Sequence, residues 1–148
     1  MLFLTFLIAC AAAGATGIIF QPGAWYDGLK KPGFTPPRWA FPVAWTSIYI
    51  LIAWAAARLA PLPGSDMAMA LWAAQIALNT LWTPVFFGAH RTGWAMAVIV
   101  ILWLVVARLT VLAFGLDVWA GVLLLPYLIW LCLAAALNFS IWRMNRRR

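Results

Sequence analysis

The chain has 148 residues, of which 67% are hydrophobic and 9% are charged, and its formal net charge is +7 at pH 7. A soluble domain of this size needs a far more polar surface, so the composition excludes a soluble enzyme or binding module and predicts a membrane protein. The sequence holds two cysteines and one histidine, which gives neither a disulfide framework nor the spacing of a metal site.

Five apolar segments are long enough to cross a bilayer as helices, since a span needs about 20 residues. They cover residues 2–21, 42–61, 67–87, 93–114 and 118–142. The connections after the second, third and fourth segments are short and contain glycine or proline, which makes neighbouring segments antiparallel. We therefore expect an all-α membrane protein, with a single transmembrane domain over 1–148 built as a five-helix bundle.

The first segment, 2–21, has a second interpretation as a cleaved secretion signal, because Leu7–Cys10 has the pattern of a lipoprotein cleavage site. Such signals begin with basic residues, and none precedes this apolar run. We therefore expect the segment to remain as the first transmembrane helix.

The connection at 22–41 combines aromatic, proline and basic residues between two apolar segments. Prolines fix φ and keep the preceding residues out of the helical region, so this loop is expected to be stiff without being regular. Tryptophan, tyrosine and cations are typical of the bilayer surface. We expect loop 22–41 to cover a ligand pocket, and its cations Lys30, Lys31 and Arg38 to contact anionic groups of a ligand or of lipid headgroups.

Three segments carry aromatic and amide side chains at helical spacing, so that each set shares one face. In 67–87 these residues are Trp72, Gln75, Asn79, Trp82 and Phe86. Segment 42–61 contributes Trp45 and Tyr49, and segment 118–142 contributes Tyr127, Trp130, Ala134, Leu137 and Asn138. Because amides are costly at membrane depth, these faces should turn inward.

Two interpretations of these faces stay open at this point. The amides of Gln75 and Asn79 could simply bond a neighbouring helix, and rings near segment ends could belong to an interfacial belt. If the three faces meet instead, they form an aromatic cavity that suits a small, flat, mostly apolar ligand.

Positive charge is concentrated on one side of the expected bundle. The residues on that side are Lys30, Lys31, Arg38, Arg91, Arg143, Arg146, Arg147 and Arg148. Arg58 and Arg108 fall near segment ends on the other side. The positive-inside rule therefore predicts an outside N-terminus and a cytoplasmic C-terminus. Without a soluble recognition module, the basic C-terminal run predicts contact with lipid headgroups and no nucleic-acid binding.

Several blocks of the sequence match a known family of membrane proteins. The blocks are Trp25–Pro32, Pro36–Trp39, Phe41–Trp45, Gln75–Gly88, Trp119–Leu123, Pro126–Trp130 and Leu137–Asn138. In content and order they closely resemble the tryptophan-rich sensory protein/translocator protein (TspO, peripheral benzodiazepine receptor) family, here a bacterial member. The resemblance covers nearly the whole chain.

The resemblance implies a five-helix bundle, often a homodimer, that binds porphyrins such as protoporphyrin IX and haem, and drug-like isoquinoline carboxamides. Such proteins are receptors or sensors linked to tetrapyrrole transport or regulation; the porphyrin is a ligand, and no cofactor is required. Together with the inward faces, it predicts a ligand site of Tyr26, Pro36, Trp39, Trp45, Tyr49, Gln75, Asn79, Trp82, Phe86, Trp130, Ala134, Leu137 and Asn138. Lys30, Lys31 and Arg38 would then contact the propionates of the porphyrin.

Two alternative functions stay open. Trp45 and Trp130 match the tryptophans linked to light-dependent porphyrin breakdown in some bacterial members, so they are the catalytic residues if this protein is an enzyme. A tetrapyrrole or sterol transporter is the other alternative, although Phe139 stands where the sterol motif of the family has tyrosine, which weakens the case for sterol. His90 is expected to be solvated, so we predict ring stacking without coordinated iron. The sequence leaves inner and outer membranes unresolved.

Overall fold

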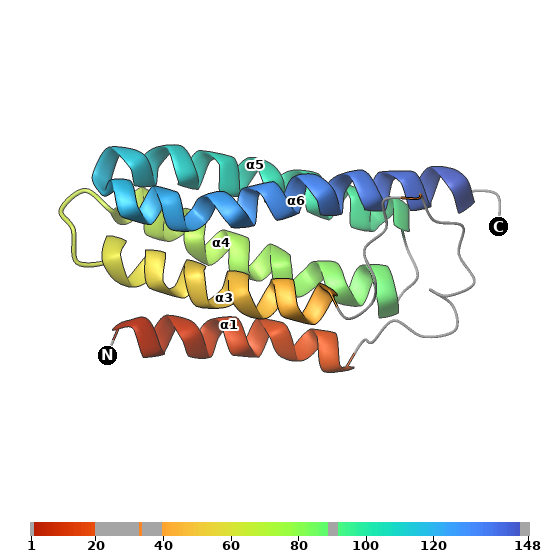
Figure 1. The fold of residues 1–148 in the computed structure, drawn as a ribbon, viewed down its shortest axis with the longest axis horizontal. Coiled ribbons are helices and arrows are strands. Elements are labelled where there is room, and N and C mark those ends of the chain that lie inside the picture. The colour runs from red at the N-terminus through yellow and green to blue at the C-terminus, as the bar shows by residue number, and fades with distance from the viewer. Residues whose placement is uncertain (1, 20–32, 34–39, 89–91, 146–148) are drawn as a thin grey trace.

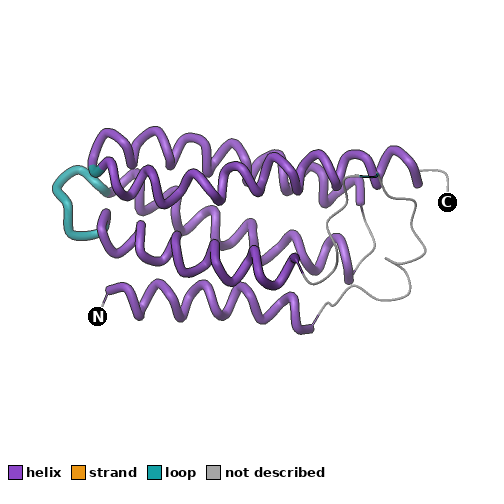
Figure 2. Tube along the Cα trace, viewed as in Figure 1, coloured by secondary structure: helices purple, strands orange, loops and turns teal. Residues whose placement is uncertain are grey.

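The computed structural model describes residues 2–19, 33, 40–88 and 92–145. This part of the chain is helical, without strands (Figures 1 and 2). The elements are α1 (Leu2–Ile19), α3 (Ala40–Leu59), α4 (Asp66–Thr83), the π-helix η1 (Pro84–Gly88), α5 (Thr92–Leu116) and α6 (Val118–Asn145). Long runs of apolar residues form these helices because a helix satisfies every interior backbone polar group within itself, which lipid demands.

Length and composition qualify three of the described helices as membrane spans. These spans are Pro42–Leu59 in α3, Gly93–Leu116 in α5 and Val118–Met144 in α6. In α1 the stretch Phe3–Ala15 is apolar but shorter. Helix α4 contains Gln75, Asn79 and Thr80, which lower its mean hydropathy. The five expected helices are thus observed, and three of them meet the criterion for crossing a bilayer.

The helices run side by side along the long axis of the molecule (Figure 1). Helix α1 packs on α3 and α4, α3 also packs on α6, and α5 packs on α4 and α6. The start of α1 lies at the same end as the α3–α4 and α5–α6 connections, and α6 ends at the opposite end. This arrangement brings the inner faces of α3, α4 and α6 together.

Prolines act differently in two of the helices. Helix α6 continues through Pro126, as helices in membranes often do when neighbours satisfy the freed carbonyl. At Pro84 the α4 helix changes into η1. Proline has no N–H for the i→i−4 ladder, so the wider π turn begins where an α-helical hydrogen bond would be missing. Phe86, which lies in this π-helix, is buried.

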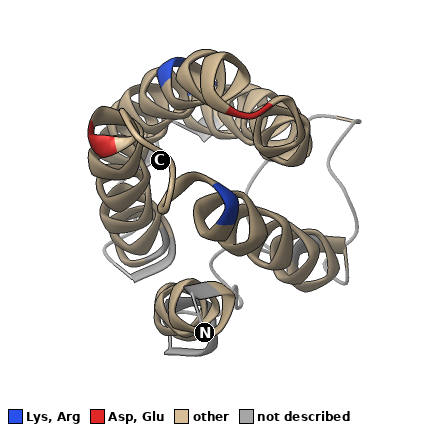
Figure 3. Cartoon of the chain, turned by 90° about the vertical axis from the view of Figure 1, so that its left-hand side faces the viewer, with Lys and Arg blue, Asp and Glu red and all other residues tan. Residues whose placement is uncertain are grey.

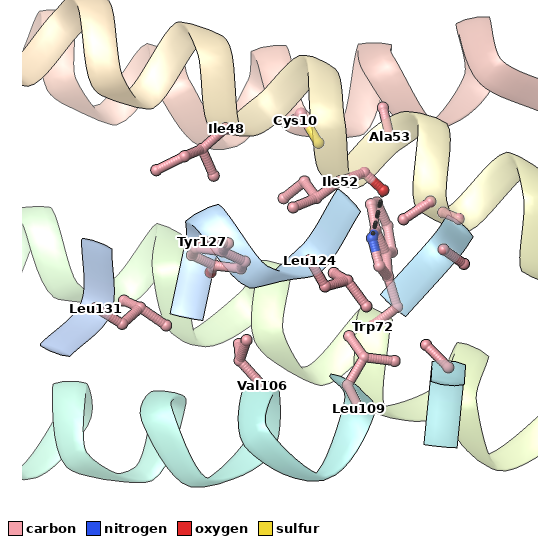
Figure 4. Close-up of a cluster of buried hydrophobic side chains, with 14 of the residues drawn as sticks. Cys10, Ile48, Ile52, Ala53, Trp72, Val106, Leu109, Leu124, Tyr127 and Leu131 are labelled. Atoms are coloured by element: carbon pink, nitrogen blue, oxygen red, sulfur yellow. Dashed lines mark hydrogen bonds between the residues drawn. The ribbon is translucent and has the colours of Figure 1, made fainter. Parts of the chain in front are cut away.

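A core of buried side chains joins five helices. Figure 4 shows Cys10, Ile52, Trp72, Leu109 and Tyr127 pointing toward one another from α1, α3, α4, α5 and α6. The indole Nε1 of Trp72 donates a hydrogen bond to the Ile52 carbonyl over 3.1 Å. The core lies directly beside the aromatic cluster described below, so it fixes the spacing of the helices that build that cluster.

Candidate functional site

Four rings from α3 and α6 form an aromatic cluster, which we define as Trp45, Tyr49, Tyr127 and Trp130. The Trp45 ring centroid lies 5.7 Å from that of Tyr49 and 6.2 Å from those of Tyr127 and Trp130. Its contacts with Tyr127 and Trp130 are edge-to-face, at 72° and 84°, an arrangement that aromatic quadrupoles favour. The half-buried Trp45 is therefore the centre of this cluster.

A chain of hydrogen bonds connects the cluster to α4; we define this polar chain as Tyr49, Asn79, Tyr127 and Gln75. The Tyr49 hydroxyl donates to Asn79 Oδ1 over 3.2 Å, and Asn79 Nδ2 donates to Tyr127 Oη over 2.9 Å. The Tyr127 hydroxyl in turn donates to Gln75 Oε1 over 2.7 Å. Gln75 is 0% exposed, Tyr127 1% and Asn79 4%. The α4 amides thus do bond a neighbouring helix, and they do so at the edge of the aromatic cluster.

A second group lies further along α4 and α6. The Trp82 and Phe86 rings are stacked, with centroids 5.1 Å apart and planes at 28°. The Trp82 indole also donates to Asn138 Oδ1 over 3.0 Å. Leu137 packs with Phe86 in the same small core. Helix α4 and η1 therefore present a continuous inward face from Gln75 to Phe86, as the sequence spacing predicts.

Helix α1 contributes through a close backbone approach. A Cβ built on Gly14 would lie 3.0 Å from Cε2 of Tyr49, which is tighter than an ordinary contact. Glycine therefore lets α1 approach the Tyr49 ring at this point. The neighbouring Cys10 is fully buried in the same core. The contact between Gly14 and Tyr49 therefore limits the position of the Tyr49 ring and of its hydroxyl.

The structure places most of the predicted site residues on facing sides of α3, α4, η1 and α6, in the two groups just described. The residues found on the inward faces are Trp45, Tyr49, Gln75, Asn79, Trp82, Phe86, Trp130, Ala134, Leu137 and Asn138. The remaining predicted contacts, all in loop 22–41, lie outside the described residues: Tyr26, Lys30, Lys31, Pro36, Arg38 and Trp39. Trp94 and Trp119 are 68% and 66% exposed, as expected for belt residues at helix ends.

Sequence reasoning missed the central role of Tyr127. Helical spacing puts Tyr127 on the inward face of 118–142, but the predicted ligand contacts do not include it. A phenol at membrane depth needs a hydrogen-bond partner, and the two amides of α4 were the available partners. That requirement was the signal in the sequence that could have identified Tyr127 as the link between α4 and α6.

An ion pair at the far end of the bundle also escaped the sequence reading. Arg58 Nε and Nη2 donate to Asp117 Oδ2 and Oδ1 over 2.7 and 3.3 Å. The Asp117 carboxylate also accepts a hydrogen bond from the Trp119 backbone N–H at 3.1 Å. The hydrogen bond from Arg58, followed by that from Trp119, holds the pKa of Asp117 below its ordinary value despite partial desolvation. The pair connects the end of α3 to the α5–α6 turn.

Figure 3 shows how few charged positions the described helices carry. Within these residues no group of three histidine, cysteine, aspartate or glutamate side chains could hold a metal ion. What converges instead is a set of ring faces and edges with amide and hydroxyl groups beside them. This chemistry suits stacking and hydrogen bonding, and it provides no acid–base pair.

Comparison with known proteins agrees with the fold and the tryptophan content. The model of the TspO/MBR family matches residues 5–143. The "Tryptophan-rich sensory protein" of Cereibacter sphaeroides is 55% identical over 99% of this chain and 93% of its own length. "Protein CrtK" of Rhodobacter capsulatus is 53% identical over 97% of this chain and 92% of its own. The human "Translocator protein" is 33% identical over 82% and 75%. This is a multi-pass integral membrane protein, and the chain belongs to the TspO/MBR family.

Proposed function

We propose that this protein is a membrane receptor or sensor that binds porphyrins and similar flat, apolar molecules at the aromatic cluster between α3, α4 and α6. One observation carries the proposal: Trp45 contacts both Tyr127 and Trp130, and Tyr127 is tied to the buried amides of α4. A porphyrin offers a broad π-face, for which such rings are a suitable surface. Membership of the TspO/MBR family supports the proposal.

The names of the relatives favour sensing or translocation over metabolism. One relative is called a sensory protein and another a translocator protein. A receptor needs only a binding site and a conformational response, and the aromatic cluster, hydrogen-bonded to α4 through Tyr127, is the candidate binding site. The predicted role of Lys30, Lys31 and Arg38 is to pair with the propionates of the porphyrin at the membrane surface.

A titration of the detergent-solubilised protein with protoporphyrin IX in the dark tests this proposal. Binding should quench tryptophan fluorescence, and Trp45→Phe or Trp130→Phe should weaken affinity because each removes a large stacking surface. Trp119→Phe is the matched control, since Trp119 lies on α6 as Trp130 does but is exposed. Equal affinities for all three variants and the wild type would exclude the aromatic cluster as the site.

Light-dependent porphyrin breakdown is a second candidate function. It is favoured by the direct ring contact between Trp45 and Trp130, the two positions that the family resemblance links to this reaction. Under illumination the absorption of bound protoporphyrin should then decay faster with wild-type protein than with Trp45→Phe or Trp130→Phe. Decay that is equal in all samples, including one without protein, would leave binding as the function. Uptake of protoporphyrin into sealed vesicles separates a transporter from a receptor.

A further inference from the structure

Helix α5 carries a single charged side chain, and it lies on the exposed, apolar side of the helix. Ile101, Leu104 and Val111 are 51%, 57% and 63% exposed. Arg108 is exposed as well, and spacings of three and four residues put all four side chains on one face. They lie within the span Gly93–Leu116. We define these four residues as the α5 stripe, which faces lipid because its side chains are exposed along a membrane span.

Arg108 lies well inside this span. Helix α5 continues to Leu116, which at a rise of 1.5 Å per residue places Arg108 about 12 Å from the end of the helix. Because Cβ of a helical residue tilts toward the N-terminus, the side chain starts out toward the bilayer centre and away from the nearer surface. Arg108 makes no hydrogen bond or ion pair with the part of the chain that the structure describes. A charged side chain at this depth is costly unless an anion accompanies it.

A second copy of the chain is a poor source of that anion. The sequence contains three acidic residues, Asp27, Asp66 and Asp117. Asp66 begins α4 and Asp117 lies between α5 and α6, while Asp27 falls in loop 22–41. None of the three therefore offers a carboxylate at the depth of Arg108. A twofold contact through α5 would also bring like charges together, because the same arginine would stand on both sides of it.

The anion that a bilayer itself supplies is the phospholipid phosphate. We propose that Arg108 binds the phosphate of an anionic phospholipid, drawn inward from the membrane surface beside the α5–α6 connection. A guanidinium presents a planar fork of N–H donors, which matches two phosphate oxygens at once. The acyl chains then run toward the bilayer centre over Leu104 and Ile101. This lipid site is separate from the aromatic cluster and does not depend on porphyrin binding.

Two lipids with the same acyl chains test the site: dioleoylphosphatidylglycerol, which is anionic, and dioleoylphosphatidylcholine, which is zwitterionic. Each is titrated on the solubilised full-length protein, and native mass spectrometry measures the dissociation constant of the first bound lipid. The wild type should prefer phosphatidylglycerol about tenfold, because the choline cation competes with Arg108 for the phosphate. Arg108→Leu should remove this preference. Arg108→Lys should keep part of it, since the charge remains without the fork.

Photo-cross-linking locates the bound lipid on the chain. Phosphatidylglycerol with a diazirine in its headgroup should label the wild type in α5 around Arg108, as mapped by mass spectrometry of its peptides. Arg108→Leu should lose this label, whereas Arg143→Leu, which removes an exposed arginine near the end of α6, should keep it.

Two results overturn the lipid site: equal binding of the two lipids by the wild type, or an α5 label that persists in Arg108→Leu. If Arg108→Leu instead separates a dimer and leaves the lipid preference unchanged, the α5 stripe is an interface between copies and the proposed lipid site is wrong.

Discussion

Tyr127 is the residue on which the interior of the bundle depends most. Its hydroxyl accepts from Asn79 and donates to Gln75, while its ring contacts Trp45. Removing the hydroxyl would leave two buried amide groups without partners, whereas removing that of Tyr49 would leave one. The energetic difference between these two tyrosines follows from their places at the middle and the end of the same chain.

Tyr127→Phe should lower the free energy of unfolding by about 1 to 3 kcal/mol for each amide group left unsatisfied. Tyr49→Phe, which removes only the 3.2 Å bond to Asn79, should cost less. Thermal or denaturant unfolding in detergent, followed by circular dichroism, compares the two variants. A Tyr49→Phe protein that is as destabilised as Tyr127→Phe would contradict the central place of Tyr127.

The sequence predicts the inward residues of α4 well, and it does so for a physical reason. Gln75, Asn79, Trp82 and Phe86 recur at helical spacing, and the amides cannot face lipid without a large cost. Their partners could not be predicted from spacing alone, because which hydroxyl meets which amide depends on the rotation and depth of α6 relative to α4. Those are fixed by packing across the whole bundle.

At the scale of elements, two specific contacts add to the apolar core in positioning the helices. Gly14 lets α1 approach Tyr49, and the Arg58–Asp117 pair connects α3 to the start of α6. The helix boundaries follow from apolar length. The π-helix after Thr83 could not be predicted from the sequence. Proline lacks the N–H that donates the i→i−4 hydrogen bond, but its presence does not determine whether a π-helix or another turn follows.

Gly14→Val should displace the Tyr49 ring, because even a Cβ at this position lies 3.0 Å from Cε2 of Tyr49. Overpacking of this kind costs about 1 to 3 kcal/mol. We expect weaker protoporphyrin binding, since Tyr49 touches Trp45 and bonds Asn79. Ala12→Val, on the exposed face of α1, is the control. Unchanged affinity in Gly14→Val would show that α1 does not set the position of Tyr49.

The ion pair predicts how stability depends on acid. Arg58 lowers the pKa of Asp117 in the folded protein. The ion pair therefore adds its full contribution to the free energy of unfolding above the ordinary aspartate pKa of about 3.9. That contribution is lost as the pH falls through the lower pKa that Asp117 has in the folded state. Asp117→Asn should therefore lower the unfolding midpoint at neutral pH, by less than Tyr127→Phe does. In acid, the unfolding midpoint of Asp117→Asn should fall less steeply than that of the wild type. Unfolding midpoints measured along a pH series test this, and parallel curves for the two proteins would exclude a role for the pair.

At the scale of the whole molecule, the alternating helices place the start of α1 and the end of α6 at opposite ends of the bundle (Figure 1). Helix number and pairing of neighbours follow from the apolar segments and their short connections. Which end faces the cytoplasm is a separate prediction, which rests on the basic residues of the sequence and the positive-inside rule. The dimer expected from the family resemblance likewise stays a prediction.

Single-cysteine variants test the orientation in intact cells. In a protein with Cys10→Ala and Cys132→Ala, a cysteine replacing the exposed Pro63 in the α3–α4 connection should react with a membrane-impermeant maleimide added outside. A cysteine replacing Arg148 should react only after the cells are opened. The reverse pattern would mean that the basic side faces outward.

We propose that the indole-bearing faces of α3, α4 and α6 together form the ligand site. A crystal structure of the protein with zinc protoporphyrin tests it most directly, because the anomalous scattering of zinc locates the ligand. We expect the porphyrin ring to lie against Trp45 and Trp130, within reach of Asn79. A porphyrin bound on the outer surface near Trp94 or Trp119, with the aromatic cluster unchanged, would contradict it.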